Sequence, residues 1–84
     1  MIVTLKLFAT LAAHLPPEAR KLNQTLVETA DGCTVLDLIA RFQVPPDLCT
    51  LVLVNGVFVT PGQFATRVLE PGDVLAIWPP VGGG

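Results

Sequence analysis

The sequence predicts an α+β fold in which one helix packs across one face of a mixed sheet of four to five strands. Three observations lead to this prediction. Residues 2–8 alternate apolar and polar side chains as a strand does. A single helical repeat, residues 34–42, lies between strand-like segments, and Asn55-Gly56 is a strong hairpin signal. The expected order is two strands, the helix and then further strands.

In the first segment, Val3, Leu5 and Leu7 share one strongly apolar face. An alanine-rich stretch, residues 9–15, is expected to form one or two helical turns, which the two prolines at 16–17 stop. A polar loop is then expected to lead to a second strand that returns as a hairpin. The loop is placed at 18–23 and the strand at 24–29.

The helix is expected to begin after Thr34, a good N-cap residue, with Asp37 as the acid of a capping box. Its buried stripe follows the spacing i, i+3, i+4, i+7. The residues of this stripe are Val35, Leu38, Ile39 and Phe42. The prolines at 45–46 must end the helix.

The second half of the chain is expected to contain a buried strand at 51–54, a type I′ turn at Asn55-Gly56 and a short returning strand. A connection follows in which three apolar side chains plug the core. These are Phe64, Val68 and Leu69. Residues 70–73 fit a type II turn, and the last strand is expected at 74–78. If the first and last strands pair at the centre of the sheet, the arrangement is the ubiquitin-like β-grasp fold.

The chain is expected to divide into a folded domain, residues 1–78, and a flexible tail, residues 79–84. The tail reads Pro79, Pro80, Val81, Gly82, Gly83, Gly84. Two prolines favour an extended stalk, and glycine supplies no side chain to bury. Six extended residues reach roughly 20 Å, enough to carry the terminal carboxylate into a partner's cleft. A frayed end or a remnant of an expression tag is the alternative.

Composition excludes several classes of protein. The 84 residues suit one small domain, and 51% of them are apolar while 14% are charged, which excludes a disordered chain. The net charge is −2 and the five cations are scattered, which disfavours nucleic-acid binding. No apolar run is long enough to span a membrane, and Lys6 comes too early for a secretory leader. We expect a cytoplasmic protein.

The thiols and the single histidine offer no obvious catalytic or metal site. Cys33 and Cys49 are far apart and have no histidine at ligand spacing, so we expect no metal and read both as buried free thiols. Cys33 lies at the expected helix start, where a sulfur-handling role is conceivable. His14 has no Ser, Cys or Asp partner that the sequence indicates.

Three stretches resemble the MoaD/ThiS family of ubiquitin-like sulfur carriers. They are VTLKLFATL at 3–11, VLVNG at 52–56 and LEPGDVLAIWPPVGGG at 69–84. The last stretch is the most specific, because its turn, strand, double proline and terminal glycines come in the family's order. The double proline and the length look most like MoaD, the small subunit of molybdopterin synthase.

The resemblance implies a carrier and not a stand-alone enzyme. An ATP-dependent E1-like enzyme would adenylate the carboxylate of Gly84, and sulfur from a donor protein would displace AMP to leave a thiocarboxylate. The large subunit of molybdopterin synthase would then receive the sulfur for molybdopterin or tungstopterin. The carrier itself would bind no cofactor, and ATP would be used by the activating partner. Pro79 to Gly83 would thread Gly84 into the partners, and slender glycines suit that path.

Docking would use an exposed apolar patch, for which Phe58 and Trp78 are candidates, with an ordinary core position as the alternative. The sequence departs from the family in lacking an arginine within Leu11-Ala12-Ala13-His14, and Gly82 is often another small residue in relatives. Three other functions stay open. They are a carrier for another acceptor such as thiazole, cysteine or tRNA, a protein modifier joined through Gly84 to a lysine, and a β-grasp interaction domain with an idle tail.

Overall fold

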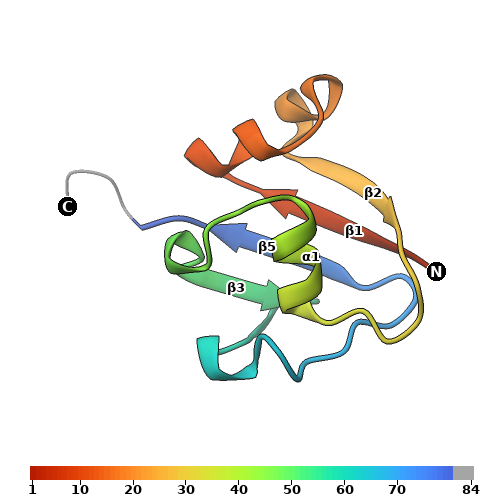
Figure 1. Cartoon of the computed structure of the whole chain (residues 1–84). Helices are drawn as coiled ribbons and strands as arrows, with labels where there is room; N and C mark the ends of the chain where they lie inside the picture. The colour runs from red at the N-terminus through yellow and green to blue at the C-terminus, as the bar shows by residue number, and fades with distance from the viewer. Residues whose placement is uncertain (81–84) are drawn as a thin grey trace.

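The computed structural model describes residues 1–80 and shows a five-stranded mixed sheet in the order β2-β1-β5-β3-β4 (Figure 1). The strands are β1 Ile2–Leu7, β2 Gln24–Glu28, β3 Leu51–Val54, β4 Val57–Phe58 and β5 Val74–Trp78. The first and last strands pair in parallel at the centre, and all other pairs are antiparallel. The predicted ubiquitin-like β-grasp fold is confirmed.

The α-helix of the described residues, α1, spans Val35–Arg41 and crosses one face of the sheet (Figure 1). In the described part of the chain, four short 3-10 helices connect the strands: η1 Ala9–His14, η2 Pro17–Leu22, η3 Pro46–Leu48 and η4 Pro61–Gln63. The helical turns expected before the double proline are therefore present as η1. The prediction of a polar loop at 18–23 is wrong, because η2 occupies most of this segment. Pro17 supplies a helical φ at its first position, and Asn23 ends it in the left-handed region.

The start of α1 shows the predicted capping box. The Asp37 backbone N–H donates to Thr34 Oγ1 at 3.1 Å, and the Thr34 backbone N–H donates to Asp37 Oδ2 at 3.0 Å. The next two N–H groups, of Val35 and Leu36, donate to main-chain carbonyls of the loop that follows η4. The free donors of the helix start are therefore satisfied within the chain, which ties this loop to α1.

The core lies between α1 and the sheet and includes the predicted stripe of the helix. Val35, Leu38 and Ile39 are fully buried, and Phe42 is partly buried against the same cluster. Their partners on the sheet are apolar side chains of the two central strands and of β3. These are Val3, Leu5, Leu7, Leu75, Ile77, Val52 and Val54.

The three predicted plugs of the core behave differently. Phe64 and Leu69 are buried, but Val68 is 44% exposed, so its predicted core position is wrong. Val68 forms an isolated antiparallel bridge with Thr34. Successive residues of an extended segment point to opposite sides, so burying Leu69 turns Val68 outward.

Two turns meet at a buried carboxylate. Asn55 and Gly56 both have positive φ, as the predicted type I′ turn requires. The Asn55 Nδ2 group donates to Asp73 Oδ1 at 2.8 Å, and Asn55 Oδ1 accepts from the Val74 N–H at 2.9 Å. Asp73, only 8% exposed, also accepts from the Glu70 N–H at 2.8 Å. The hairpin is thus joined to the type II turn, which Glu70 and Asp73 close by a main-chain hydrogen bond of 3.0 Å.

We expect Asn55→Ala to lower the free energy of unfolding by about 2 kcal/mol, because the buried carboxylate of Asp73 loses one of its two donors and alanine is strained at positive φ. Urea unfolding monitored by circular dichroism measures this loss. Asn55→Gly is the control: it keeps the backbone conformation available and isolates the lost hydrogen bonds, so it should cost about half as much. A stability change below ~0.5 kcal/mol in Asn55→Ala would contradict this role for the side chain.

Candidate functional site

The end of β5 is held firmly on both sides. The Trp78 ring stacks on the Phe8 ring with centroids 4.4 Å apart and planes 7° from parallel. The Phe8 N–H donates to the Ile77 carbonyl at 3.1 Å, and the Thr50 N–H donates to the Trp78 carbonyl at 3.0 Å. Whatever follows Trp78 therefore starts from a strand that both neighbours fix in place.

The predicted tail begins at this point. The two predicted stalk residues, Pro79 and Pro80, directly follow the strand. Pro79 is half-buried and Pro80 is exposed. The other predicted tail residues lie outside the described residues. They are Val81, Gly82, Gly83 and Gly84. The predicted division into residues 1–78 and 79–84, and the role of Gly84, stay predictions.

The face of the sheet opposite α1 is largely apolar, and we call it the outer face. Pairing places Trp78 beside Leu51, Ala76 beside Leu53, and Leu53 beside Phe58. The members of the outer face are Ile2, Thr4, Lys6, Phe8, Gln24, Leu26, Glu28, Leu51, Leu53, Phe58, Val74, Ala76 and Trp78.

Both predicted docking residues lie on the outer face, with β3 between them. Phe58 is 52% exposed and Trp78 is half-buried, so neither belongs to the core cluster and the ordinary-core alternative fails. Sequence reasoning missed Phe8, Leu51 and Leu53 as companions of these two aromatic residues. The alternation in each strand separates two faces, but only the strand order shows which residues lie next to one another.

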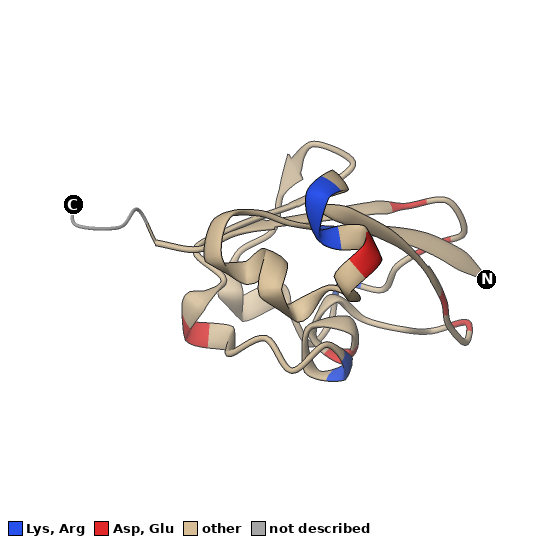
Figure 2. Ribbon diagram, turned by 90° about the horizontal axis from the view of Figure 1, so that it is seen from above, with Lys and Arg blue, Asp and Glu red and all other residues tan. Residues whose placement is uncertain are grey.

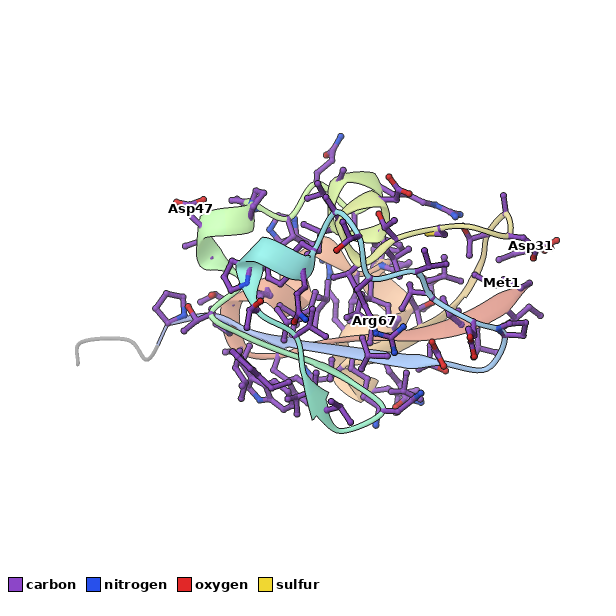
Figure 3. The ribbon with its side chains drawn as sticks, turned by 90° about the horizontal axis from the view of Figure 1, so that it is seen from below. Met1, Asp31, Asp47 and Arg67 are labelled. Carbon is purple, nitrogen blue, oxygen red and sulfur yellow. The ribbon has the colours of Figure 1, made fainter. Side chains whose placement is uncertain are left out.

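Charged residues are scattered along the chain and gather in no basic stretch (Figure 2). Asp47 lies near the end of the molecule where β5 finishes, whereas Met1 and Asp31 lie at the opposite end (Figure 3). Within residues 1–80 no group of three or more His, Cys, Asp or Glu side chains could hold a metal ion. None of the helices in this part of the chain is long and apolar enough to cross a membrane.

The two thiols differ in exposure. Cys49 is buried as expected, and its Sγ lies 3.6 Å from the Pro45 carbonyl oxygen. Burial raises the pKa of the Cys49 thiol, and the negative charge of Asp47 raises it further, so the reactive thiolate is disfavoured. Cys33 was expected to be buried but is half-buried, because it lies in the loop that precedes α1.

His14 is half-buried, and its Nδ1 atom lies 3.2 Å from the Phe42 carbonyl oxygen at the end of α1. This contact joins η1 to α1, and no nucleophile among the described residues is hydrogen-bonded to the ring.

The central parallel pair of strands, the single helix and the apolar outer face define a ubiquitin-like β-grasp protein. Comparison with known families agrees with this class: the ThiS family matches residues 6–84. The chain belongs to the ThiS family, a group of ubiquitin-like sulfur carriers and modifiers. The resemblance noted in the sequence is therefore confirmed at the level of the family.

Solved structures of similar proteins fall into both groups. SAMP1 from Haloferax volcanii is 30% identical, with full coverage of both chains and a TM-score of 0.65. The HVO 2177 protein of the same organism is 25% identical, with 100% of this chain and 87% of that one covered and a TM-score of 0.75. A putative molybdopterin converting factor subunit 1 from Pyrococcus furiosus is 25% identical, with 95% and 98% covered and a TM-score of 0.63. A search of curated proteins found no match.

Proposed function

We propose that this chain is a sulfur carrier whose Gly84 carboxylate is adenylated and then converted to a thiocarboxylate. The observation that carries this proposal is the position of the Pro-Pro-Val-Gly-Gly-Gly segment, which directly follows the central strand of a ThiS-family fold. The chain itself would perform no catalysis. It would present its last residue to enzymes that do.

The chemistry requires activation because a carboxylate is a poor electrophile. In the proposed reaction, a Gly84 oxygen attacks the α-phosphorus of ATP and pyrophosphate leaves. The outer sulfur of a persulfide on a donor protein then attacks the acyl carbon, and AMP departs with the electrons of the C–O bond. A thiol reductant cleaves the S–S bond of the resulting acyl disulfide, which releases the thiocarboxylate and leaves a disulfide between the donor and the reductant. Because ATP is consumed, the proposal places the protein in the cytoplasm, with an E1-like adenylating enzyme as its first partner.

The second partner in this proposal is the large subunit of molybdopterin synthase, where the thiocarboxylate would deliver sulfur to a pterin precursor. The likeness to the Pyrococcus furiosus subunit 1 supports this acceptor. The outer face, with Phe58 and Trp78, is the proposed docking surface. Its stacked rings of Phe8 and Trp78 lie at the end of β5, where the tail starts.

We expect incubation with the adenylating enzyme of the same organism, ATP and a sulfur donor to raise the intact mass by about 16 Da, the difference between sulfur and oxygen. Electrospray mass spectrometry measures this shift, and omission of ATP is the control. An unchanged mass, with pyrophosphate release by the enzyme equally absent, would contradict the proposal.

A protein modifier is the second candidate, and the 30% identity to a small archaeal modifier protein favours it. In that case Gly84 would end in an isopeptide bond to a lysine. Immunoblots of cells that express the tagged protein would show high-mass bands that disappear when Gly84 is removed. A carrier alone would produce the mass shift without those bands.

A further inference from the structure

Lys6 is the only cation in the five strands, and it lies in the middle of the outer face. Its neighbours across the sheet are Gln24 on β2 and Ala76 on β5. Beyond Ala76 the same row continues with Leu53 and Phe58. The Lys6 side chain thus starts from a largely apolar surface.

Within residues 1–80, the strands of the sheet offer Lys6 no carboxylate partner nearby. Glu28 is the only acidic residue of the strands, and it pairs with Ile2, four residues away along β1. Four residues of a strand span about 13 Å. In the other direction Lys6 is only two residues, or about 7 Å, from Phe8 and its stack with Trp78.

A partner that covers the outer face therefore also covers the Lys6 side chain, which is half-buried in the free protein. An ammonium group buried without a counter-charge is strongly unfavourable, whereas one buried against a carboxylate with good geometry can contribute to affinity and specificity. A partner surface with a carboxylate opposite Lys6 is favoured over a purely apolar one on this ground.

The position of the tail identifies the kind of partner. Trp78 is the last residue of β5, and the six residues that follow reach roughly 20 Å when extended. An enzyme bound over the outer face would therefore have Gly84 within reach of its active site. We propose that Lys6 is a specificity-determining residue, and that the adenylating enzyme docks through an apolar surface with a carboxylate opposite it. This inference rests on the proposed function.

The test measures pyrophosphate release by the purified adenylating enzyme as a function of carrier concentration. We expect Lys6→Glu to raise the KM for the carrier by about tenfold or more and to leave kcat within about twofold, because docking weakens while the reacting carboxylate is unchanged. Lys6→Gln should raise KM less. Lys21→Glu is the matched control: Lys21 is exposed in η2, outside the outer face, and its KM should equal that of the wild type.

The dependence of KM on salt concentration distinguishes an ion pair made by Lys6 from a structural role of this residue. The wild-type KM should rise as sodium chloride is added, and the KM of Lys6→Gln should rise far less, because only the ion pair is screened. Because this comparison uses only the wild type and Lys6→Gln, it still tests the proposal if Lys6→Glu fails to fold.

Equal KM values for Lys6→Glu and Lys21→Glu would overturn the inference while leaving the proposed function intact. Absence of pyrophosphate release with the wild type would overturn both. A dimer of the carrier alone in size-exclusion chromatography, dissociated by Phe58→Ser, would assign the outer face to a second copy and would also overturn the inference.

Discussion

Deletion of Gly84 is expected to abolish sulfur loading, with a loss of at least about 100-fold in kcat/KM for adenylation. The deletion leaves Gly82-Gly83 at the end, so a diglycine terminus is still present. What changes is reach: the reacting carboxylate moves back by about 3.5 Å. A misplacement of even about 1 Å can cost a factor of 100 when the reacting groups must be held in line. Pyrophosphate release and the mass shift measure the loss.

Stability should not change in this variant. Among residues 1–80 the hydrophobic core runs from Val3 to Ile77, and the deleted glycine has no side chain that could add to it. The melting temperature is the first control. Gly82→Ala is the second, because it keeps the length and the terminal pair and should still be loaded. Loading of the Gly84 deletion at the wild-type rate would show that Gly84 is not the reacting residue.

Leu75→Ala is expected to have the largest effect on stability. Leu75 lies in the central strand β5 and is 0% exposed. Its truncation removes buried apolar surface and leaves a cavity that a close-packed core cannot fill, at a cost of about 3 kcal/mol. For a domain of this size, the melting temperature should fall by roughly 12–24 °C. Differential scanning calorimetry measures both quantities.

Leu26→Ala is the matched control because it removes the same atoms from the edge strand β2. Leu26 is 71% exposed, so its loss should cost less than ~0.5 kcal/mol. Similar losses in the two variants would mean that β5 is not the centre of the core. The free energy of unfolding of a small domain is only about 5–15 kcal/mol, so the difference in stability between Leu75→Ala and Leu26→Ala should be easy to resolve.

The features that could be predicted from the sequence alone are local. The capping box of Thr34 and Asp37, the turn at Asn55-Gly56 and the turn at 70–73 each depend on residues within four positions of one another, so propensity and side-chain chemistry were enough. The 3-10 helix η2 was missed because its residues carry no apolar period, and its start depends on Pro17 alone.

Which of these local pieces meet depends on how the whole chain packs. The bond between Asn55 and Asp73 joins residues 18 positions apart. The outer face brings β1, β3 and β5 together through pairings between distant parts of the chain. Alternation along a strand assigns each side chain to one of two faces, but the neighbours across the sheet are set by strand order and register, which the packing of the whole core selects. The position of Lys6 between Gln24 and Ala76 is a property of that packing.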